Sequence, residues 1–268
     1  MLLETSIRFA GRLGEKAWAQ WDALRHAAAV IGTVFGDCVR PRRWTRPVWR
    51  ALARQVVTIG IGPLGFVAAL AGFAGISVVV QLTFWVGEVG QTQALGPLLV
   101  TVVARELAPA LINLVVIVRS GSAMTTELGV MELNGEVRAM EEQGCDPFSH
   151  LVLPRVLGMA VSTFCLTIVF ILVAFVSGYL FVGWMGQGSR DLFLYADTLS
   201  RALQAKDIFN ILAKSILPAL YAGASCCIGG LSVGGAVTEI PPATQRALTR
   251  SVAGLFVISA VASLLTYL

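Results

Sequence analysis

Five long apolar stretches limit the folds that this chain can adopt. A helix needs about 20 mainly apolar residues to cross the hydrocarbon core of a bilayer, and each stretch is longer than that: 56–86, 96–118, 151–184, 208–231 and 243–268. They are apolar on all sides instead of alternating, which indicates helices and not the strands of a barrel. With 56% hydrophobic and 13% charged residues, the composition also excludes an ordinary water-soluble domain. The sequence therefore predicts an all-α integral membrane protein with five transmembrane helices.

Residues 1–54 differ from the apolar stretches that follow. Apolar and charged side chains are mixed over residues 2–36, which is typical of an amphipathic helix in the membrane interface; a soluble helix packed on a partner is the alternative. A basic run with two tryptophans then predicts an anchor at the level of the lipid headgroups. No cleavable signal is evident. We therefore divide the chain into an N-terminal interfacial segment, 1–54, and a membrane domain, 55–268. The basic run comprises Arg40, Arg42, Arg43, Arg46, Arg50 and Arg54.

Lysine and arginine placement predicts the orientation, because cytoplasmic loops carry the excess of these residues. A cytoplasmic N-terminus puts the arginine-rich start of the chain on the cytoplasmic side, together with the basic residues that flank the polar segment 119–150. The opposite side then receives only Arg190, Arg201 and Lys206. Five spans place the C-terminus on that second side.

Three charged residues lie well away from the ends of predicted spans or within their apolar part, where charges are costly and indicate function. Arg105 and Glu106 are adjacent in the second span, with Pro109 just after them to open the backbone. Adjacent side chains on a helix point about 100° apart, so the two are poor partners for each other. Lys214, followed by Pro218, lies in the fourth span. The alternative for Arg105 and Glu106 is a structural ion pair with a neighbouring helix, and the alternative for Lys214 is a side chain that extends to the interface. Charges of both signs inside the membrane favour an amphiphilic ligand.

The polar segment 119–150 carries a helical pattern and a sharp turn. Leu133, Val137 and Met140 share one stripe of a helix, while Glu132 and Glu136 share another. A helix stop, an N-cap and a first-turn proline follow at Gly144, Asp146 and Pro147. A short amphipathic helix of this kind predicts a docking element for a cytoplasmic motor. A merely solvated loop is the alternative.

The residues for several other chemistries are missing. No phosphate-binding loop of the form Gly-x-x-x-x-Gly-Lys-[Ser/Thr] occurs, so we expect ATP to be bound and hydrolysed by a separate subunit, and no cofactor on this chain. With His26 and His150 as the two histidines, no catalytic triad is credible and an enzyme is not expected. The five cysteines lack metal-ligand spacing and predict no metal site. The net charge of +4 fits anionic lipid headgroups better than nucleic acid.

Five short motifs occur in a specific order: Arg105-Glu106-Leu107-Ala108-Pro109, Arg119-Ser120-Gly121-Ser122-Ala123, Thr126-Glu127-Leu128-Gly129-Val130-Met131, Gly144-Cys145-Asp146-Pro147 and Leu153-Pro154-Arg155. Together they resemble the MlaE (YrbE-like) permease family, and the resemblance covers the chain from about Arg54 to Leu268. A weaker match follows them at Lys214-Ser215 and Ala243-Thr244-Gln245-Arg246. In two places the chain departs from the family pattern: Ser259 stands where an aspartate is usual, and Gly234-Gly235-Ala236-Val237 replaces a more polar stretch.

The resemblance implies a lipid permease of the bacterial inner membrane, working as one of two permease copies. It implies cytoplasmic ABC ATPase subunits on the loop between spans two and three, a periplasmic ring of MCE-domain proteins, and room for a small cytoplasmic accessory protein. Phospholipids or related lipids would move between the inner and outer membranes. By position, Arg54, Arg105, Glu106, Lys214 and Arg246 would line the lipid cavity. The residues implied to couple to the ATPase are Glu127, Glu132, Glu136, Val137, Met140, Gly144, Asp146 and Pro147.

Two other function classes fit the same spans. A proton-coupled secondary transporter would use Glu106 as its proton carrier, although the sequence shows no inverted repeat. A non-transporting membrane scaffold would need neither Glu106 nor Lys214. The lipid species, the direction of transport and the choice between identical and non-identical permease copies are left open by the sequence.

Overall fold

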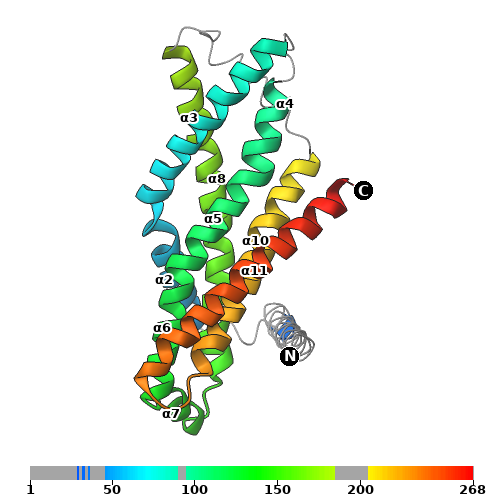
Figure 1. Cartoon of the computed structure of the whole chain (residues 1–268). Helices are drawn as coiled ribbons and strands as arrows, with labels where there is room; N and C mark the ends of the chain where they lie inside the picture. Colours follow the sequence, from blue (N-terminus) through cyan, green and yellow to red (C-terminus); the bar gives the residue numbers. More distant parts are fainter. Residues whose placement is uncertain are drawn as a thin grey trace, which may run out of the picture.

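The membrane domain is a bundle of long helices (Figure 1). The computed structural model describes residues 46–89, 95–184 and 205–267, together with residues 29, 32, 33 and 36. None of these residues forms a strand. Five helices within the described ranges are long and apolar enough to cross a membrane, which confirms the predicted fold class: Arg46–Trp85, Pro97–Leu133, Phe148–Phe181, Lys206–Leu231 and Val237–Thr266. The predicted interfacial helix at the N-terminus lies almost entirely outside the described residues.

The first span consists of two helices that meet at a proline. Helix α2 covers Arg46–Ile61 and α3 covers Leu64–Val89. Pro63 has no N–H to continue the ladder of α2, and its carbonyl instead accepts the first bond of α3, from the Val67 amide at 2.8 Å. The apolar stretch predicted as one helix from residue 56 is therefore broken near its start.

The second span is continuous well past the predicted end at residue 118. It runs through α4 (Leu95–Leu99), η3 (Val100–Leu107), α5 (Ala108–Val116), η4 (Ile117–Gly121) and α6 (Ser122–Leu133). Both η3 and η4 are π-helical, a geometry frequent at functional sites. The polar residues after 118 do not end the helix. One side of α6 is buried, and α6 packs on the fourth and fifth spans.

The elbow, residues 134–147, joins the second span to the third and contains two turns instead of one. Helix α7 covers Glu136–Glu142 and is separated from α6 by Gly135, whose φ of 72° is left-handed. The second turn is the predicted one: Gly144 has a φ of 75°, and a carboxylate oxygen of Asp146 accepts a hydrogen bond from the Phe148 amide at 3.1 Å. The stripe predicted as a single amphipathic helix is thus divided at Gly135.

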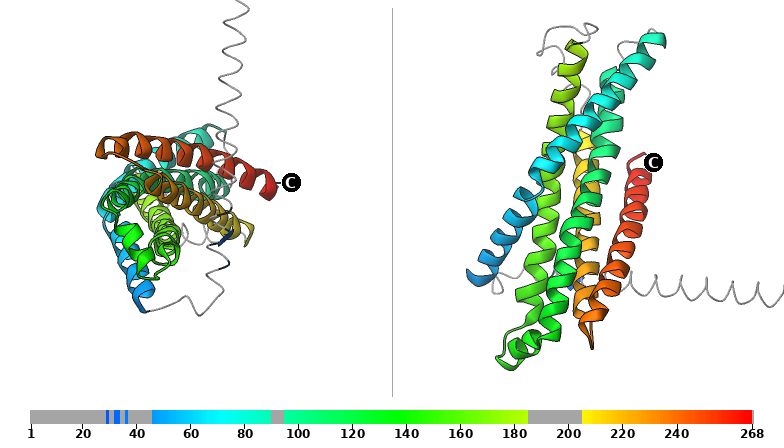
Figure 2. Two further views of the ribbon diagram at one scale, coloured as in Figure 1. Left: turned by 90° about the horizontal axis from the view of Figure 1, so that it is seen from below. Right: turned by 60° about the vertical axis from the view of Figure 1, so that its left-hand side comes forward.

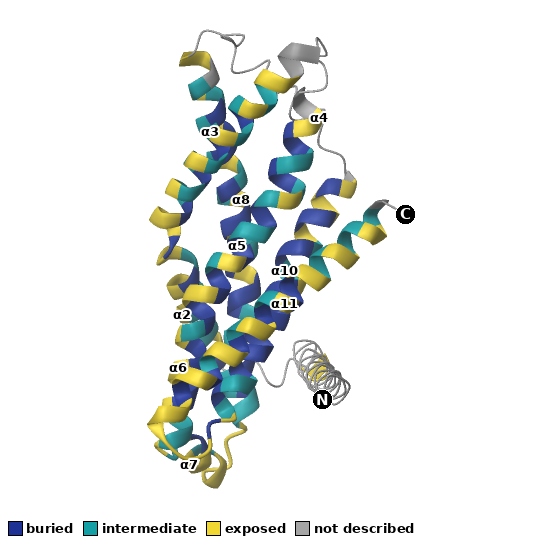
Figure 3. Cartoon of the chain, in the orientation of Figure 1, coloured by how far each residue is buried: buried dark blue, intermediate teal, exposed yellow. Residues whose placement is uncertain are grey.

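The remaining helices place α8 and α10 inside the bundle. Helix α8 (Leu153–Trp184), preceded by the π-helical η5 (Phe148–Val152), contacts α2, α3, α5 and α10. Helix α10 (Ala205–Leu231) is the most buried span, with 72% of its apolar window inside the bundle. After the short 3₁₀ helix η6 (Val237–Glu239), α11 (Ile240–Tyr267) packs along α10 at the outside (Figures 2 and 3). The elbow lies at the lower end in Figure 1, and α11 runs away from that end.

Candidate functional site

Two ion pairs join the second span to the fourth; we call Arg105, Glu106, Asp207 and Lys214 the charged layer. Arg105 Nε lies 2.8 Å from Asp207 Oδ1, and Lys214 Nζ lies 2.5 Å from Glu106 Oε1. Burial of an isolated charge in an apolar bundle is costly, and a close opposite charge offsets that cost. The layer therefore keeps four charges inside the membrane domain with no net charge.

Helix geometry explains why neighbouring residues of η3 find separate partners on one helix. Arg105 and Glu106 point in different directions, as predicted from their adjacency. Asp207 and Lys214 are seven residues apart, which places them on the same side of α10 but about two turns apart. Each residue of η3 therefore reaches a different turn of α10. This arrangement matches the ion-pair alternative for Arg105 and Glu106.

Lys214 does not extend to the interface, because its side chain is 1% exposed and ends on Glu106. Helix α10 continues for eight residues between Lys206 and Lys214, a rise of about 12 Å. The ammonium group also lies 3.4 Å from the backbone carbonyl of Arg105. Lys214 is thus a buried partner of the second span.

Two prolines release the backbone carbonyls that the layer uses. Pro109 has no N–H for the Arg105 carbonyl four residues earlier, and that carbonyl accepts a bond from Lys214 Nζ. Pro218 likewise leaves the Lys214 carbonyl without its helical donor, and Asn113 Nδ2 donates to this carbonyl at 3.1 Å. Each helix therefore supplies the donor that the proline of the other helix removed.

Glu106 is the part of the layer that other groups can reach. Its side chain is 48% exposed, whereas those of Lys214 and Asp207 are 1% and 2% exposed. Ser263 of α11 donates a hydrogen bond to the same Glu106 oxygen, at 3.3 Å. The carboxylate therefore connects three spans and retains an open side.

Asn210 lies between the two ion pairs along α10 and is 1% exposed. Neither its amide nitrogen nor its amide oxygen has a hydrogen-bond partner in the described part of the chain. Unsatisfied buried polar groups cost about 1–3 kcal/mol each. Asn210 is therefore available to bind a polar group that enters the layer.

The other predicted cavity residues lie away from the charged layer. Arg54 is exposed on α2, and Arg246 is exposed on α11, where its Nε donates to the Pro242 carbonyl at 3.2 Å. Arg246 lies near the start of α11, 17 residues before Ser263, and Arg54 lies in the middle of α2. The structure brings Arg105, Glu106 and Lys214 together, and it does not bring Arg54 or Arg246 to them.

The predicted coupling residues gather around the elbow. Glu127 on α6 pairs with Arg155 of α8 at 3.2 Å, beside a surface hollow of about 640 Å³ that both side chains line. Val137 is 8% exposed and is the buried residue of α7. Acidic side chains cover the outside of the elbow, since Glu136, Glu141 and Glu142 are exposed. The elbow therefore offers a negative surface on a fixed turn.

Four residues of the site were not predicted from the sequence: Asp207, Asn113, Asn210 and Ser263. Asp207 lies just outside the fourth span predicted over 208–231, but it is buried within α10. Its spacing of seven residues from Lys214 was the signal that could have found it. Among the described residues, no three histidine, cysteine, aspartate or glutamate side chains are grouped to hold a metal ion.

Comparison with known proteins places the chain in a family. The model of the family described as "Permease MlaE" matches residues 52–265. Protein TRIGALACTOSYLDIACYLGLYCEROL 1, chloroplastic, of Arabidopsis thaliana is 28% identical over 78% of this chain, which spans only 59% of that relative's length. A probable ABC transporter permease protein of Synechocystis sp. is 28% identical, over 74% of this chain and 75% of the relative. One from Porphyra purpurea is 29% identical, over 69% and 70%. The match of the family model to most of the membrane domain shows that the chain belongs to the MlaE permease family, and is thus a transport subunit.

Proposed function

We propose that this chain is the permease subunit of an ATP-driven ABC transporter that moves phospholipids or related lipids between the inner and outer membranes of a bacterium. The relatives from Synechocystis and Porphyra carry the name of ABC transporter permeases, which supports the transporter class. The Arabidopsis relative is named after a galactolipid, which supports a lipid as the cargo.

The open side of Glu106 is the observation that carries this proposal. An amphiphile needs apolar walls for its chains and a polar group for its head, and buried charges in a membrane domain mark such a path. Glu106 presents a half-exposed carboxylate, and Lys214 behind it is held by the same oxygen. A headgroup that engages Glu106 would compete with Lys214 and with Ser263 for that oxygen. Cargo binding would thereby change the contacts among three spans.

ATP hydrolysis belongs to a partner in this proposal. The chain has no phosphate-binding loop, and the elbow presents exposed glutamates on a fixed turn. An ATPase subunit with a basic groove would complement that surface. A second permease copy, an MCE-domain ring on the periplasmic side and a small cytoplasmic accessory protein complete the proposed assembly.

Removing both charges of the Glu106–Lys214 pair tests the role of the layer in transport. The double variant Glu106→Gln/Lys214→Met keeps the side-chain volumes and leaves no unpaired charge, so it should fold with stability close to that of the wild type. We expect the rate of ATP-dependent transfer of a fluorescent phospholipid out of proteoliposomes to be at least tenfold lower for the double variant than for the wild type. The proteoliposomes would contain the chain with the ATPase that co-purifies with it.

The controls separate folding from transport. Glu106→Gln alone leaves the buried Lys214 charge without its partner and should reduce the free energy of unfolding by about 3–5 kcal/mol. Arg250→Gln removes an exposed charge of α11 and should leave transport unchanged. Transfer at the wild-type rate by the double variant would show that the pair is only structural. Uptake driven by a proton gradient without ATP would replace the ABC mechanism by a secondary one.

A further inference from the structure

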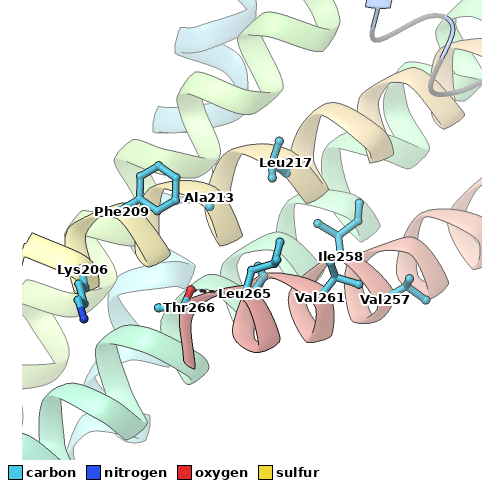
Figure 4. A pocket seen from close by; sticks show the side chains of 10 residues that line it. Lys206, Phe209, Ala213, Leu217, Val257, Ile258, Val261, Leu265 and Thr266 are labelled. Carbon is cyan, nitrogen blue, oxygen red and sulfur yellow. Dashed lines mark hydrogen bonds between the residues drawn. The ribbon is translucent and has the colours of Figure 1, made fainter. Parts of the chain in front are cut away.

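An apolar groove of about 800 Å³ follows the line where α10 and α11 meet (Figure 4). Helix α10 contributes Lys206, Phe209, Ala213 and Leu217 at intervals of three or four residues, so they form one continuous wall. Helix α11 contributes an apolar wall that includes Val257, Val261 and Leu265. The two helices run antiparallel, so Lys206 and Thr266 lie at one end of the groove and Leu217 and Val257 at the other (Figure 4).

This groove is distinct from the charged layer. Lys206 and Asp207 are adjacent, so their side chains leave α10 about 100° apart. Asp207 turns into the bundle toward Arg105, whereas Lys206 is exposed and lines the groove. None of the four residues of the charged layer lines the groove. The groove therefore opens on another side of α10.

The groove has the dimensions of one membrane leaflet. From Lys206 to Leu217, α10 rises by about 16 Å, and half of a bilayer core measures about 15 Å. Lysines near span ends hold their ammonium groups at the level of the headgroups. An acyl chain whose headgroup lies at Lys206 would thus reach Leu217 near the middle of the bilayer.

Lys206 gives the groove a preference for a negatively charged headgroup. It is the one charged residue among those that line the groove, and the ion pairs of the described residues do not include it. Thr266 at the same end donates its hydroxyl hydrogen to the Ala262 carbonyl at 2.8 Å. The ammonium group is therefore the available donor at this end.

We propose that the groove between α10 and α11 binds one acyl chain of an anionic membrane lipid, with the headgroup phosphate held by Lys206. The site requires only that the chain spans a membrane, and it exists whether or not a lipid is the transported cargo. One lysine near an anionic headgroup contributes about fivefold in affinity. The preference over a zwitterionic lipid should be of that size.

Photo-crosslinking in liposomes tests the site on the protein with its co-purified subunits. Phosphatidylcholine vesicles would contain a small fraction of a lipid with a photoreactive group at mid-chain, either phosphatidylglycerol or phosphatidylcholine. Mass spectrometry would compare the label on α10–α11 peptides with the label on the exposed face of α8 near Leu172. We expect phosphatidylglycerol to label α10–α11 about fivefold more than phosphatidylcholine does, with no such ratio on α8.

Four variants define the result. Lys206→Gln should reduce the phosphatidylglycerol label to the level of phosphatidylcholine. Ala213→Trp fills the groove and should reduce the label from both lipids, whereas Leu172→Trp on α8 should change neither. Equal labelling of α8 and the groove, or a groove label without headgroup preference, would overturn the proposal. So would a disulfide between two copies through Val261→Cys, because a second copy would then cover the groove.

Discussion

At the residue scale, the charged layer depends as much on backbone groups as on charges. Lys214 donates to the carbonyl that Pro109 releases, and Asn113 donates to the carbonyl that Pro218 releases. A buried carbonyl without a partner costs about 1–3 kcal/mol. The two prolines are therefore tolerated because each helix completes the other.

A double-mutant cycle tests whether Asn113 replaces the backbone donor that Pro218 removes. Asn113→Leu should reduce the free energy of unfolding by about 1–3 kcal/mol, because the Lys214 carbonyl loses its donor. In a Pro218→Ala background the new amide supplies that donor, so the same substitution should cost about 1 kcal/mol less. Thermal unfolding of the detergent-solubilised protein measures both. Strictly additive losses would show that the asparagine acts elsewhere.

Among the residues of the site, the sequence identified only those whose side chains are unusual inside a membrane. Arg105, Glu106 and Lys214 stood out because charges are rare there. Asn113 and Ser263 did not, since short polar side chains are common in spans and usually bond within their own helix. Asp207 was hidden by its position at the edge of an apolar stretch. The partners of each charge could not be predicted, because the packing of helices is not encoded in the hydropathy of any one of them.

At the element scale, small residues determine how closely α3 and α8 approach. A Cβ at Gly75 would overlap the Ala174 backbone, and one at Gly178 would overlap Val79. Small residues four apart in the first span permit such contact in lipid, where no hydrophobic force drives helices together. The number of spans could be predicted from length and hydropathy. The breaks at Pro63 and Gly135 were missed although the sequence carries their signals, since a proline inside a helix removes a backbone donor and an Asn-Gly pair favours a turn.

Gly72 and Gly75 form a matched pair for testing this packing. Gly75→Ala should destabilise the bundle by about 1–3 kcal/mol, since its methyl group has no room beside Ala174. Gly72→Ala, one turn earlier, meets nothing within 4 Å and should be neutral or stabilising by up to about 1 kcal/mol. Thermal unfolding would compare the two variants. Equal effects would mean that the close approach of α3 and α8 contributes nothing specific.

At the scale of the whole molecule, orientation and ATPase docking meet at the elbow. Cys145 is exposed there, while Cys226 and Cys227 are buried and Cys165 lies on a spanning helix. The predicted orientation puts Cys145 on the cytoplasmic side. The proposed docking puts it under the ATPase.

Labelling of Cys145 tests both expectations. In a Cys38→Ser background, a membrane-impermeant maleimide should label inside-out vesicles at least tenfold more than right-side-out ones, because the bilayer blocks the reagent. Bound ATPase should protect the thiol in inside-out vesicles. Cys145→Ser provides the blank. Labelling of right-side-out vesicles would reverse the orientation, and labelling unaffected by the ATPase would move the docking site elsewhere.

The ion pairs and hydrogen bonds between the second and fourth spans also limit how the membrane domain can move. A slide of one residue between them would separate Arg105 from Asp207, Lys214 from Glu106 and Asn113 from the Lys214 carbonyl in a single step. We therefore expect these two helices to travel as one rigid unit throughout a cycle. The last turns of α11 reach that unit through the Ser263 hydroxyl on Glu106, so a headgroup that displaces Ser263 would loosen this end of α11. The acid proposed to meet the cargo would then also be the acid that holds the end of the fifth span.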